Sequence, residues 1–167
     1  MSVDVPYIDR TRDYYQAEGY EKPYQWAHFE TVPFTPLAKP LAECCVTIVS
    51  TSGMRSRSGN LREAEEQHGA GFASSTYSIP SDFPIDDLFT DRMGYDRFAT
   101  HLEDVGSYFP LARLRSAVAS GRAGAVAARC HGVTENYSQR RTSTIDAPAI
   151  LEKCREDGVD VALLVPV

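Results

Sequence analysis

The sequence has few cysteines, and their spacing excludes the frameworks that cysteine often builds. Cys44, Cys45, Cys130 and Cys154 form no C-x-x-C pair or other zinc-ligand spacing. Cys44 and Cys45 are adjacent, and adjacent cysteines do not usually pair with each other. We therefore expect reduced thiols in a cytoplasmic protein, with no metal site.

The sequence also lacks long apolar runs and an excess of positive charge. No apolar run approaches the ~20 residues that span a bilayer, and the first residues have neither the basic nor the apolar region of a signal peptide. The formal net charge is −6, whereas a nucleic-acid-binding protein usually carries a basic surface. We expect neither a membrane nor a nucleic-acid partner.

The chain has 167 residues, of which 24% are charged and 43% hydrophobic, as is typical of one globular domain. Its first part differs, because prolines interrupt an aromatic-rich stretch and prevent regular structure beyond a short helix at 9–19. We predict an extended aromatic and proline-rich N-terminal arm over 1–42 and an α/β domain over 43–167. The arm wraps either its own domain or a partner subunit, and the residues leave both alternatives open.

Strands and helices alternate after the arm, which indicates an α/β fold with a mainly parallel sheet flanked by helices. The last strand is rich in valine and leucine, so we expect it to be buried on both faces. The stretch from 81 to about 107 is expected to be irregular and acidic. The sequence predicts strands at 44–50, 74–79, 123–130 and 159–167, and helices at 109–120 and 146–157.

Candidate functional residues gather at three strand ends: Thr51-Ser52-Gly53, Cys130-His131-Gly132 and Pro166-Val167. The carboxyl ends of parallel strands lie at one edge of a sheet, where α/β proteins bind ligands. Backbone N–H groups and the hydroxyls of Thr51 and Ser52 are suited to a small anion. The match to a phosphate-binding loop is weak, because neither GxGxxG nor GxxxxGK[ST] is present.

Two residues are candidates for catalysis. His131 is the best acid/base candidate, because an unperturbed imidazole titrates near neutral pH. The alternative, which the residues favour slightly, is a histidine that is hydrogen-bonded in a loop. Cys130 is a redox or nucleophilic candidate if its pKa is lowered, with packing as the alternative. Glu135, Tyr137 and Arg140 are candidates for substrate binding in the following polar loop, with Arg140 or Arg141 pairing a substrate carboxylate. A solvated loop without a binding role is the alternative.

The order of several segments resembles the short proteins of the glycine/sarcosine/betaine/D-proline reductase selenoprotein B family. The resemblance covers nearly the whole chain. Each segment is only moderately specific, and the resemblance rests on all of them occurring in the same order. The segments are Pro23-Tyr24-Gln25-Trp26, Pro33-Phe34-Thr35-Pro36-Leu37, Lys39-Pro40-Leu41, Thr51-Ser52-Gly53, Ser78-Ile79-Pro80, Phe109-Pro110-Leu111-Ala112-Arg113-Leu114, Glu156-Asp157-Gly158-Val159-Asp160 and Pro166-Val167.

The resemblance implies an oxidoreductase subunit that reductively cleaves a carbon–nitrogen bond in an amino-acid-like substrate. It implies a selenocysteine or cysteine nucleophile, a second cysteine, and electrons from a dithiol or a thioredoxin-like reductant. An alternative is a non-catalytic subunit or small-ligand-binding protein that has lost the redox cysteine. A third, weaker hypothesis is hydrolytic or lyase chemistry at His131.

The sequence departs from the family pattern at two places. The family's reactive Sec/Cys-x-x-Cys segment is expected just beyond a strand such as 163–167, so we expect the nucleophile beyond Val167 or on a partner subunit. A selenocysteine codon read as a stop, a truncation and a processed chain are all compatible with this pattern. The segment Met93-Gly94-Tyr95-Asp96 lacks the family's histidines. We also expect a homo- or hetero-oligomer, because the arm and the last strand leave apolar surface.

Overall fold

The computed structural model describes residues 6–23, 25, 27–59, 61, 76–91, 102–133 and 138–167. The chain forms two compact units, Met1–Thr35 and Pro36–Val167. In the first unit, helix α1 spans Tyr7–Ala17 and none of its residues is buried. Gly19 follows the helix with φ of 87°, a left-handed conformation that suits glycine after a helix end. The predicted domain boundary at residue 42 stays a prediction.

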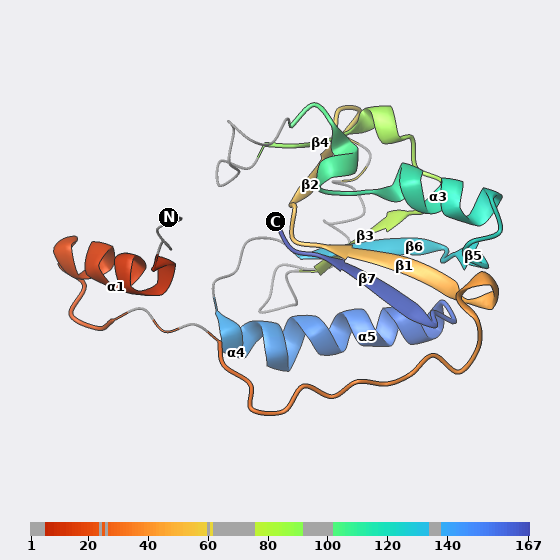
Figure 1. Ribbon diagram of the computed structural model, residues 1–167. Coiled ribbons are helices and arrows are strands. Elements are labelled where there is room, and N and C mark those ends of the chain that lie inside the picture. The colour runs from red at the N-terminus through yellow and green to blue at the C-terminus, as the bar shows by residue number, and fades with distance from the viewer. Residues whose placement is uncertain are drawn as a thin grey trace, which may run out of the picture. The chain divides into compact units, whose positions relative to one another are not determined.

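The second unit is built on strand β1 (Cys45–Ser50). On one side, β1 pairs in parallel first with β5 (Ala125–Val126) and then with β6 (Arg129–Val133). On its other side, β1 pairs in parallel with β7 (Val161–Val165). Strand β3 (Thr76–Pro80) extends the sheet antiparallel to β6. The predicted α/β fold with a mainly parallel sheet is confirmed (Figure 1).

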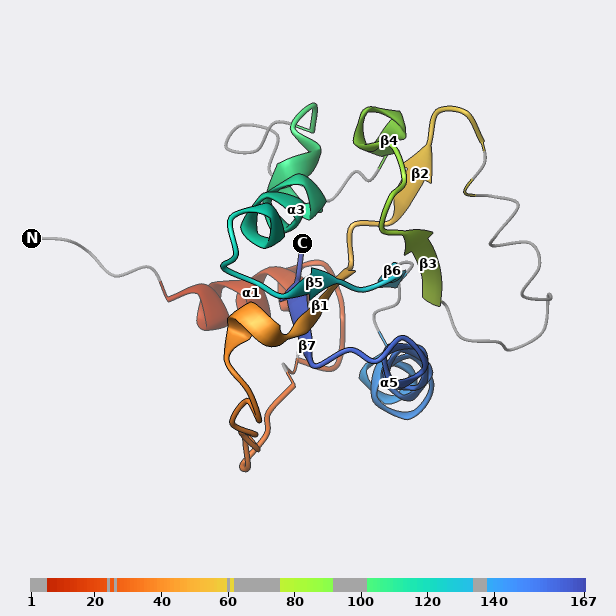
Figure 2. The same cartoon turned by 90° about the vertical axis from the view of Figure 1, so that its right-hand side faces the viewer.

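Two helices cover opposite faces of this sheet, as Figures 1 and 2 show. Helix α3 (Leu111–Ala119) ends before Gly121, and helix α5 (Ala147–Glu156) ends before Gly158. Both glycines have positive φ, as the sequence pattern predicts. Because strand side chains alternate between faces, β1 contributes Val46 and Ile48 to the hydrophobic core. That core also contains Phe109, Leu111 and Leu114 from the α3 segment.

The helix before β7 begins earlier than its sequence pattern predicts. A turn of α-helix, α4 (Gln139–Arg141), continues through a π-helical segment (Thr142–Asp146) directly into α5. Ser138 caps the start, and its side chain accepts a hydrogen bond from the N–H of Arg141. The hydroxyls of Ser143 and Thr144 donate to backbone carbonyls one turn earlier, which helps to satisfy the acceptors that a π-helical segment disturbs.

The acidic stretch after Pro80, expected to be irregular, contains a strand. Strand β4 (Leu88–Thr90) pairs antiparallel with β2 (Met54–Ser56) in a second, two-stranded sheet. Short 3₁₀ turns lie at Ile85–Asp87, Val105–Ser107 and Leu41–Glu43. A three-residue strand is too short to show the alternation by which strands are recognised in a sequence.

The last strand exists where the sequence predicts it, but the prediction that it is buried is wrong. The side chains of Ala162, Leu163 and Leu164 are exposed, and those of Val161 and Val165 are half-buried. The apolar run is compatible with a central strand, whereas β7 lies at the edge of the sheet and pairs, among the described residues, with β1 alone. No helix in the described part of the chain is both long and apolar enough to cross a membrane.

A glycine in β6 permits a close approach between two strands. A Cβ added to Gly132 would lie 2.1 Å from Cζ and 2.2 Å from Oη of Tyr77. The Tyr77 ring therefore lies directly over Gly132, and its hydroxyl oxygen accepts a 2.8 Å hydrogen bond from the N–H of Met54. This contact connects β3 and β6 to the start of β2.

We expect Gly132→Ala to destabilise the protein by about 1–3 kcal/mol, because the tyrosine ring must move out of a packed position. Urea denaturation of the full chain measures the loss. In a Tyr77→Leu background the same substitution should cost clearly less, since the obstructing ring is gone. An equal cost in both backgrounds would contradict the proposed clash.

Candidate functional site

The strongest structural candidate for a site is the end of the sheet at which β1, β6 and β7 finish, that is, the edge formed by their carboxyl ends. The register pairs Ser50 with Gly132 on one side and with Val165 on the other, so the three strand ends are adjacent as predicted. The helix that begins at Gln139 starts near this same end of the sheet (Figure 1). This edge is where ligands bind in open parallel α/β sheets.

Thr51 fixes the end of β7 to the end of β1. Its Oγ1 donates to the carbonyl of Val167 and accepts from the N–H of Val167, each at 3.0 Å. The N–H of Thr51 also donates to the carbonyl of Val165 at 3.3 Å. The Thr51 hydroxyl is therefore engaged within the chain, and it holds Val167 beside the loop that follows β1.

Ser52 and Gly53 shape that loop from inside the protein. The hydroxyl oxygens of Ser50 and Ser52 are hydrogen-bonded at 2.9 Å, and Ser50 also donates to the carbonyl of Tyr108 at 2.8 Å. Thr90 donates to the Ser52 carbonyl at 2.7 Å. Gly53 has φ of 59°, which turns the chain into β2. A fully paired buried network of this kind holds a loop rigidly.

The two predicted catalytic residues lie on opposite faces of the sheet. Cys130 belongs to the hydrophobic core on the α3 face, and burial raises the pKa of its thiol. His131, its neighbour in β6, points to the α5 face, because consecutive strand residues alternate. The two side chains therefore do not form a nucleophile–base pair with each other, and their catalytic roles stay predictions.

His131 is completely buried. Its Nδ1 lies 3.0 Å from the hydroxyl oxygen of Ser78, its antiparallel partner in β3, and its Nε2 is buried without a hydrogen-bond partner. Burial first, and then the positive charges of Lys153 and Arg129, lower the pKa of His131 to about 4. The imidazole is therefore neutral at pH 7 and is shielded from solvent.

Cationic and acidic side chains surround this histidine on the α5 face. Burial lowers the pKa of Lys153, whose Nζ donates to the hydroxyl of Thr76 at 3.3 Å. Arg129 binds Asp157 through two hydrogen bonds of 2.9 Å, and this pairing lowers the pKa of the Asp157 carboxyl. The ion pair joins the start of β6 to the end of α5.

Arg140 is exposed in the first turn of the helix that starts at this edge, which is compatible with its predicted role toward a carboxylate. Glu135 and Tyr137 lie outside the described residues. Within the described ranges, no three His, Cys, Asp or Glu side chains gather in a way that could hold a metal ion.

The structure adds residues that the sequence patterns do not indicate. Thr90 and Tyr108 are buried at the loop after β1, and Asp146 is completely buried in the π-helical segment, 4.0 Å from Nε of Arg141. The consecutive hydroxyl residues Thr142-Ser143-Thr144 ahead of Asp146 were the available signal, since such residues pair with nearby backbone groups. The contacts of Thr90 and Tyr108 are made across the fold and have no sequence signal.

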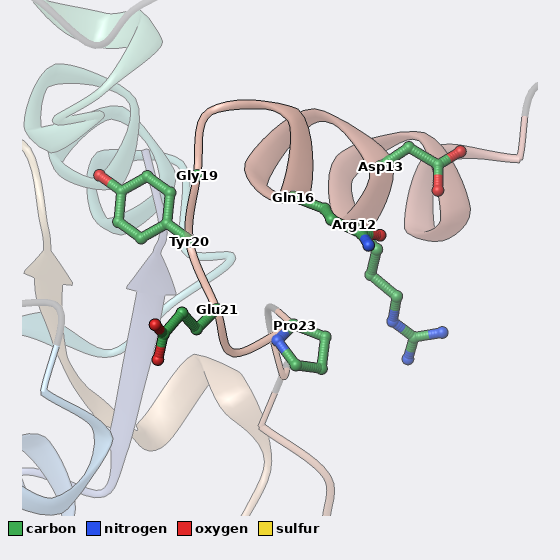
Figure 3. Close-up of a pocket in the computed structure, with 7 residues that line it drawn as sticks. All are labelled: Arg12, Asp13, Gln16, Gly19, Tyr20, Glu21 and Pro23. Carbon is green, nitrogen blue, oxygen red and sulfur yellow. The ribbon is translucent and has the colours of Figure 1, made fainter.

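The arm contains a hollow of its own, with a volume of about 560 Å³. Figure 3 shows its lining side chains on α1 and on the segment that follows the helix. Charges of both signs are present, and the hollow contains none of the predicted site residues. The lining residues are Arg12, Asp13, Gln16, Gly19, Tyr20, Glu21 and Pro23.

Comparison with known proteins finds a distant relation to one reductase subunit. The chain is 26% identical over 132 residues to D-proline reductase subunit gamma of Acetoanaerobium sticklandii, a match that covers 78% of this chain and 52% of that protein. The chain thus spans about half the length of this curated relative. No family model matches the sequence, and no solved structure matches it.

The lowered pKa of His131 predicts how stability depends on pH. The unfolded imidazole takes up a proton near pH 6.5, whereas the folded one does so only near pH 4. Stability should therefore fall as the pH decreases from 6.5 to 4, by up to about 3 kcal/mol, and His131 should add no further slope below that range. Asp157 and Asp160, whose carboxyl pKa is lowered, contribute to the loss of stability only below this pH range.

Urea denaturation between pH 4 and 7.5 measures this dependence. His131→Gln should flatten the fall between pH 6.5 and 4, whereas the control His28→Gln, at an exposed position, should leave it unchanged. Parallel curves for His131→Gln and the unsubstituted protein would contradict the assignment.

Thiol reactivity tests the predicted role of Cys130. Burial raises the pKa of Cys45, Cys130 and Cys154, so we expect native alkylation by iodoacetamide at pH 7.5 to be at least about tenfold slower than that of a free thiol. Peptide mapping by mass spectrometry identifies the labelled sites, and all four cysteines should react in guanidinium. Rapid native labelling of Cys130 would contradict the core assignment and favour a reactive thiol.

Proposed function

We propose that this chain is a subunit of a reductase system that cleaves a carbon–nitrogen bond in an amino-acid-like substrate. The observation that carries the proposal is the match of 132 residues to a protein named as a D-proline reductase subunit. The α/β fold and the convergence of three parallel strand ends at one edge are compatible with a small-molecule site there.

In this proposal the reactive thiol or selenol acts at the sheet edge beside Val167. It is supplied by residues beyond Val167 or by a partner subunit. The nucleophile bonds to the substrate carbon as the carbon–nitrogen bond breaks, the nitrogen leaves as an amine, and a dithiol donates the two electrons and two protons that complete the reduction. The hydrogen bonds of Thr51 to Val167 support this placement, because they hold the end of β7 at the loop after β1.

The chain's own contribution is to position the reacting groups. Backbone N–H groups near the loop after β1 and the guanidinium of Arg140 are suited to the carboxylate of an amino-acid-like substrate. The buried Ser50–Ser52 network keeps the loop in one conformation, so that less entropy is lost on binding. His131 contributes no proton in this proposal, because α5 covers it and it has no exposed surface.

The experiment uses the chain together with the proteins that co-purify with it from its native host. Glycine, sarcosine, betaine and D-proline are offered one at a time with dithiothreitol. We expect one of them to release one amine, or one opened amino acid, per dithiol oxidised, and the activity to disappear when the chain is removed. Turnover that persists in full without the chain would contradict the proposed function.

Arg140→Gln sharpens the test. If Arg140 pairs the substrate carboxylate, we expect KM to rise by roughly tenfold or more, because a charge-assisted hydrogen bond contributes about 1.5–3 kcal/mol. Arg122→Gln is the matched control, since Arg122 is an exposed arginine before β5, at the other end of the sheet. Equal KM values for the two variants would exclude the role of Arg140.

A non-catalytic binding subunit is the second candidate, and one observation favours it. The described cysteines are buried or half-buried, and burial raises the pKa of three of them. Titration calorimetry with the same four compounds separates the two candidates. Substrate binding without dithiol oxidation in the co-purified assembly indicates the binding subunit, whereas coupled oxidation indicates the reductase subunit.

A further inference from the structure

In the part of the chain that the structure describes, the outer edge of β7 has no strand partner and lacks the usual protection. Natural edge strands carry charged residues, proline or a bulge that prevent further pairing. Residues Val161–Val165 have none of these, and among the described residues β7 pairs only with β1. The strand therefore offers backbone N–H and C=O groups to a further strand.

The direction of these backbone groups follows from the pairing of β7 with β1. The N–H of Thr51, directly after β1, donates to the carbonyl of Val165. Because backbone groups alternate along a strand, those of Val161 and Leu163 also point toward β1, in agreement with the register of the two strands. The N–H and C=O groups of Ala162 and Leu164 then point away from β1.

The side chains along this edge are apolar and uncovered on both faces of the sheet. Leu163 is 44% exposed and pairs with Ile48, whose side chain lies on the α3 face. Leu164 is 69% exposed and pairs with Val49, on the α5 face. An exposed apolar surface on both faces of one strand is typical of an interface.

Helix α5 extends this surface. Lys153 on α5 contacts Thr76 of β3, so the flank of the helix that carries Lys153 faces the β3 side of the sheet. At 100° per residue, Leu151 lies on the opposite flank, toward β7. Leu151 is also exposed, and it adds to the apolar surface formed by Leu163 and Leu164.

We propose that β7 pairs antiparallel with β7 of a second copy of this chain across a two-fold axis, which joins the two sheets into one. A register centred on Leu163 places Leu163 opposite itself, Val161 opposite Val165 and Ala162 opposite Leu164. In this register the outward N–H and C=O of Ala162 in each copy meet the outward C=O and N–H of Leu164 in the other, so the required backbone groups face each other.

Charge favours a second copy over a charged partner segment. The chain carries a net charge of −6, yet the paired segment contains no charged residue, so like charges are not opposed along it. The nearest acidic group, Asp160, would face Pro166 of the other copy. It is already paired with Lys39 at 2.8 Å. A two-fold contact of this kind is self-complementary and closes at a dimer.

The surface lies at the strand rather than in the proposed substrate site, and the inference is independent of the proposed reductase function. The test uses the full chain at tens of micromolar. Light scattering is expected to give twice the chain mass of 18.5 kDa. A monomer at that concentration would overturn the proposal.

Substitution locates the interface. Leu163→Lys places two like charges opposite each other across the axis and should weaken the dimer by roughly a hundredfold. Leu37→Lys, which adds the same charge at a residue of the same compact unit that is 50% exposed, is the matched control and should leave the dimer intact. Circular dichroism checks that both variants are folded, and a Leu163→Lys protein that remains dimeric would contradict the interface.

Amide exchange of the unsubstituted protein tests the register without any variant. The N–H groups of Ala162 and Leu164 should be protected at high concentration and should exchange rapidly after dilution to monomer, whereas the N–H of Leu163 should stay protected by β1 in both states. Protection of Ala162 and Leu164 in the monomer would mean that another segment covers the edge and would overturn the proposal. Unprotected Ala162 and Leu164 in a dimer would place the interface elsewhere and would equally overturn it.

Discussion

The parallel pairing of β1 on both of its sides is the constraint on which the rest of the second unit depends. β6 and β7 both run parallel to β1, so their carboxyl ends come to the same edge. The helices that lead back to the start of each strand must then cover the faces of the sheet. Without β1 in the centre, neither the loop at 51–53 nor the end of β7 would have a defined position.

Polar side chains make this arrangement specific. Thr47 in the middle of β1 donates to the Arg129 carbonyl at 2.8 Å, just after the gap between β5 and β6. Thr51 closes the end of the ladder with β7. At the start of the same ladder, the Asp160 carboxylate accepts a hydrogen bond from the N–H of Cys45 at 2.7 Å and pairs with Lys39. These contacts favour one register among several that an apolar strand would accept. The largest penalty for a shifted register falls on Thr47, because its hydroxyl is buried and would lose its partner.

Much of the fold could be predicted from the sequence, while less of the candidate site could be. The strand at 44–50, both major helices and the glycines after them follow from local patterns of valine, leucine, proline and glycine, and the structure confirms them. The burial of His131 could not be predicted in this way. It depends on the position of α5 above β6, which no local pattern encodes. The antiparallel β2–β4 pair could not be predicted, because each strand has only three residues.

The sequence by itself determined the α/β class, the position of most elements and the convergence of strand ends at one edge, because hydrophobic period and helix-end residues act over a few neighbouring positions. Only the tertiary structure decided that Cys130 and His131 face opposite sides, that Thr51 is engaged with Val167, and that β7 has a strand partner on one side alone among the described residues. A run such as Val161–Val165 reads the same in a central strand and in an edge strand. What distinguishes the two is the number of neighbours that the chain topology places beside it, and this is a property of the whole fold.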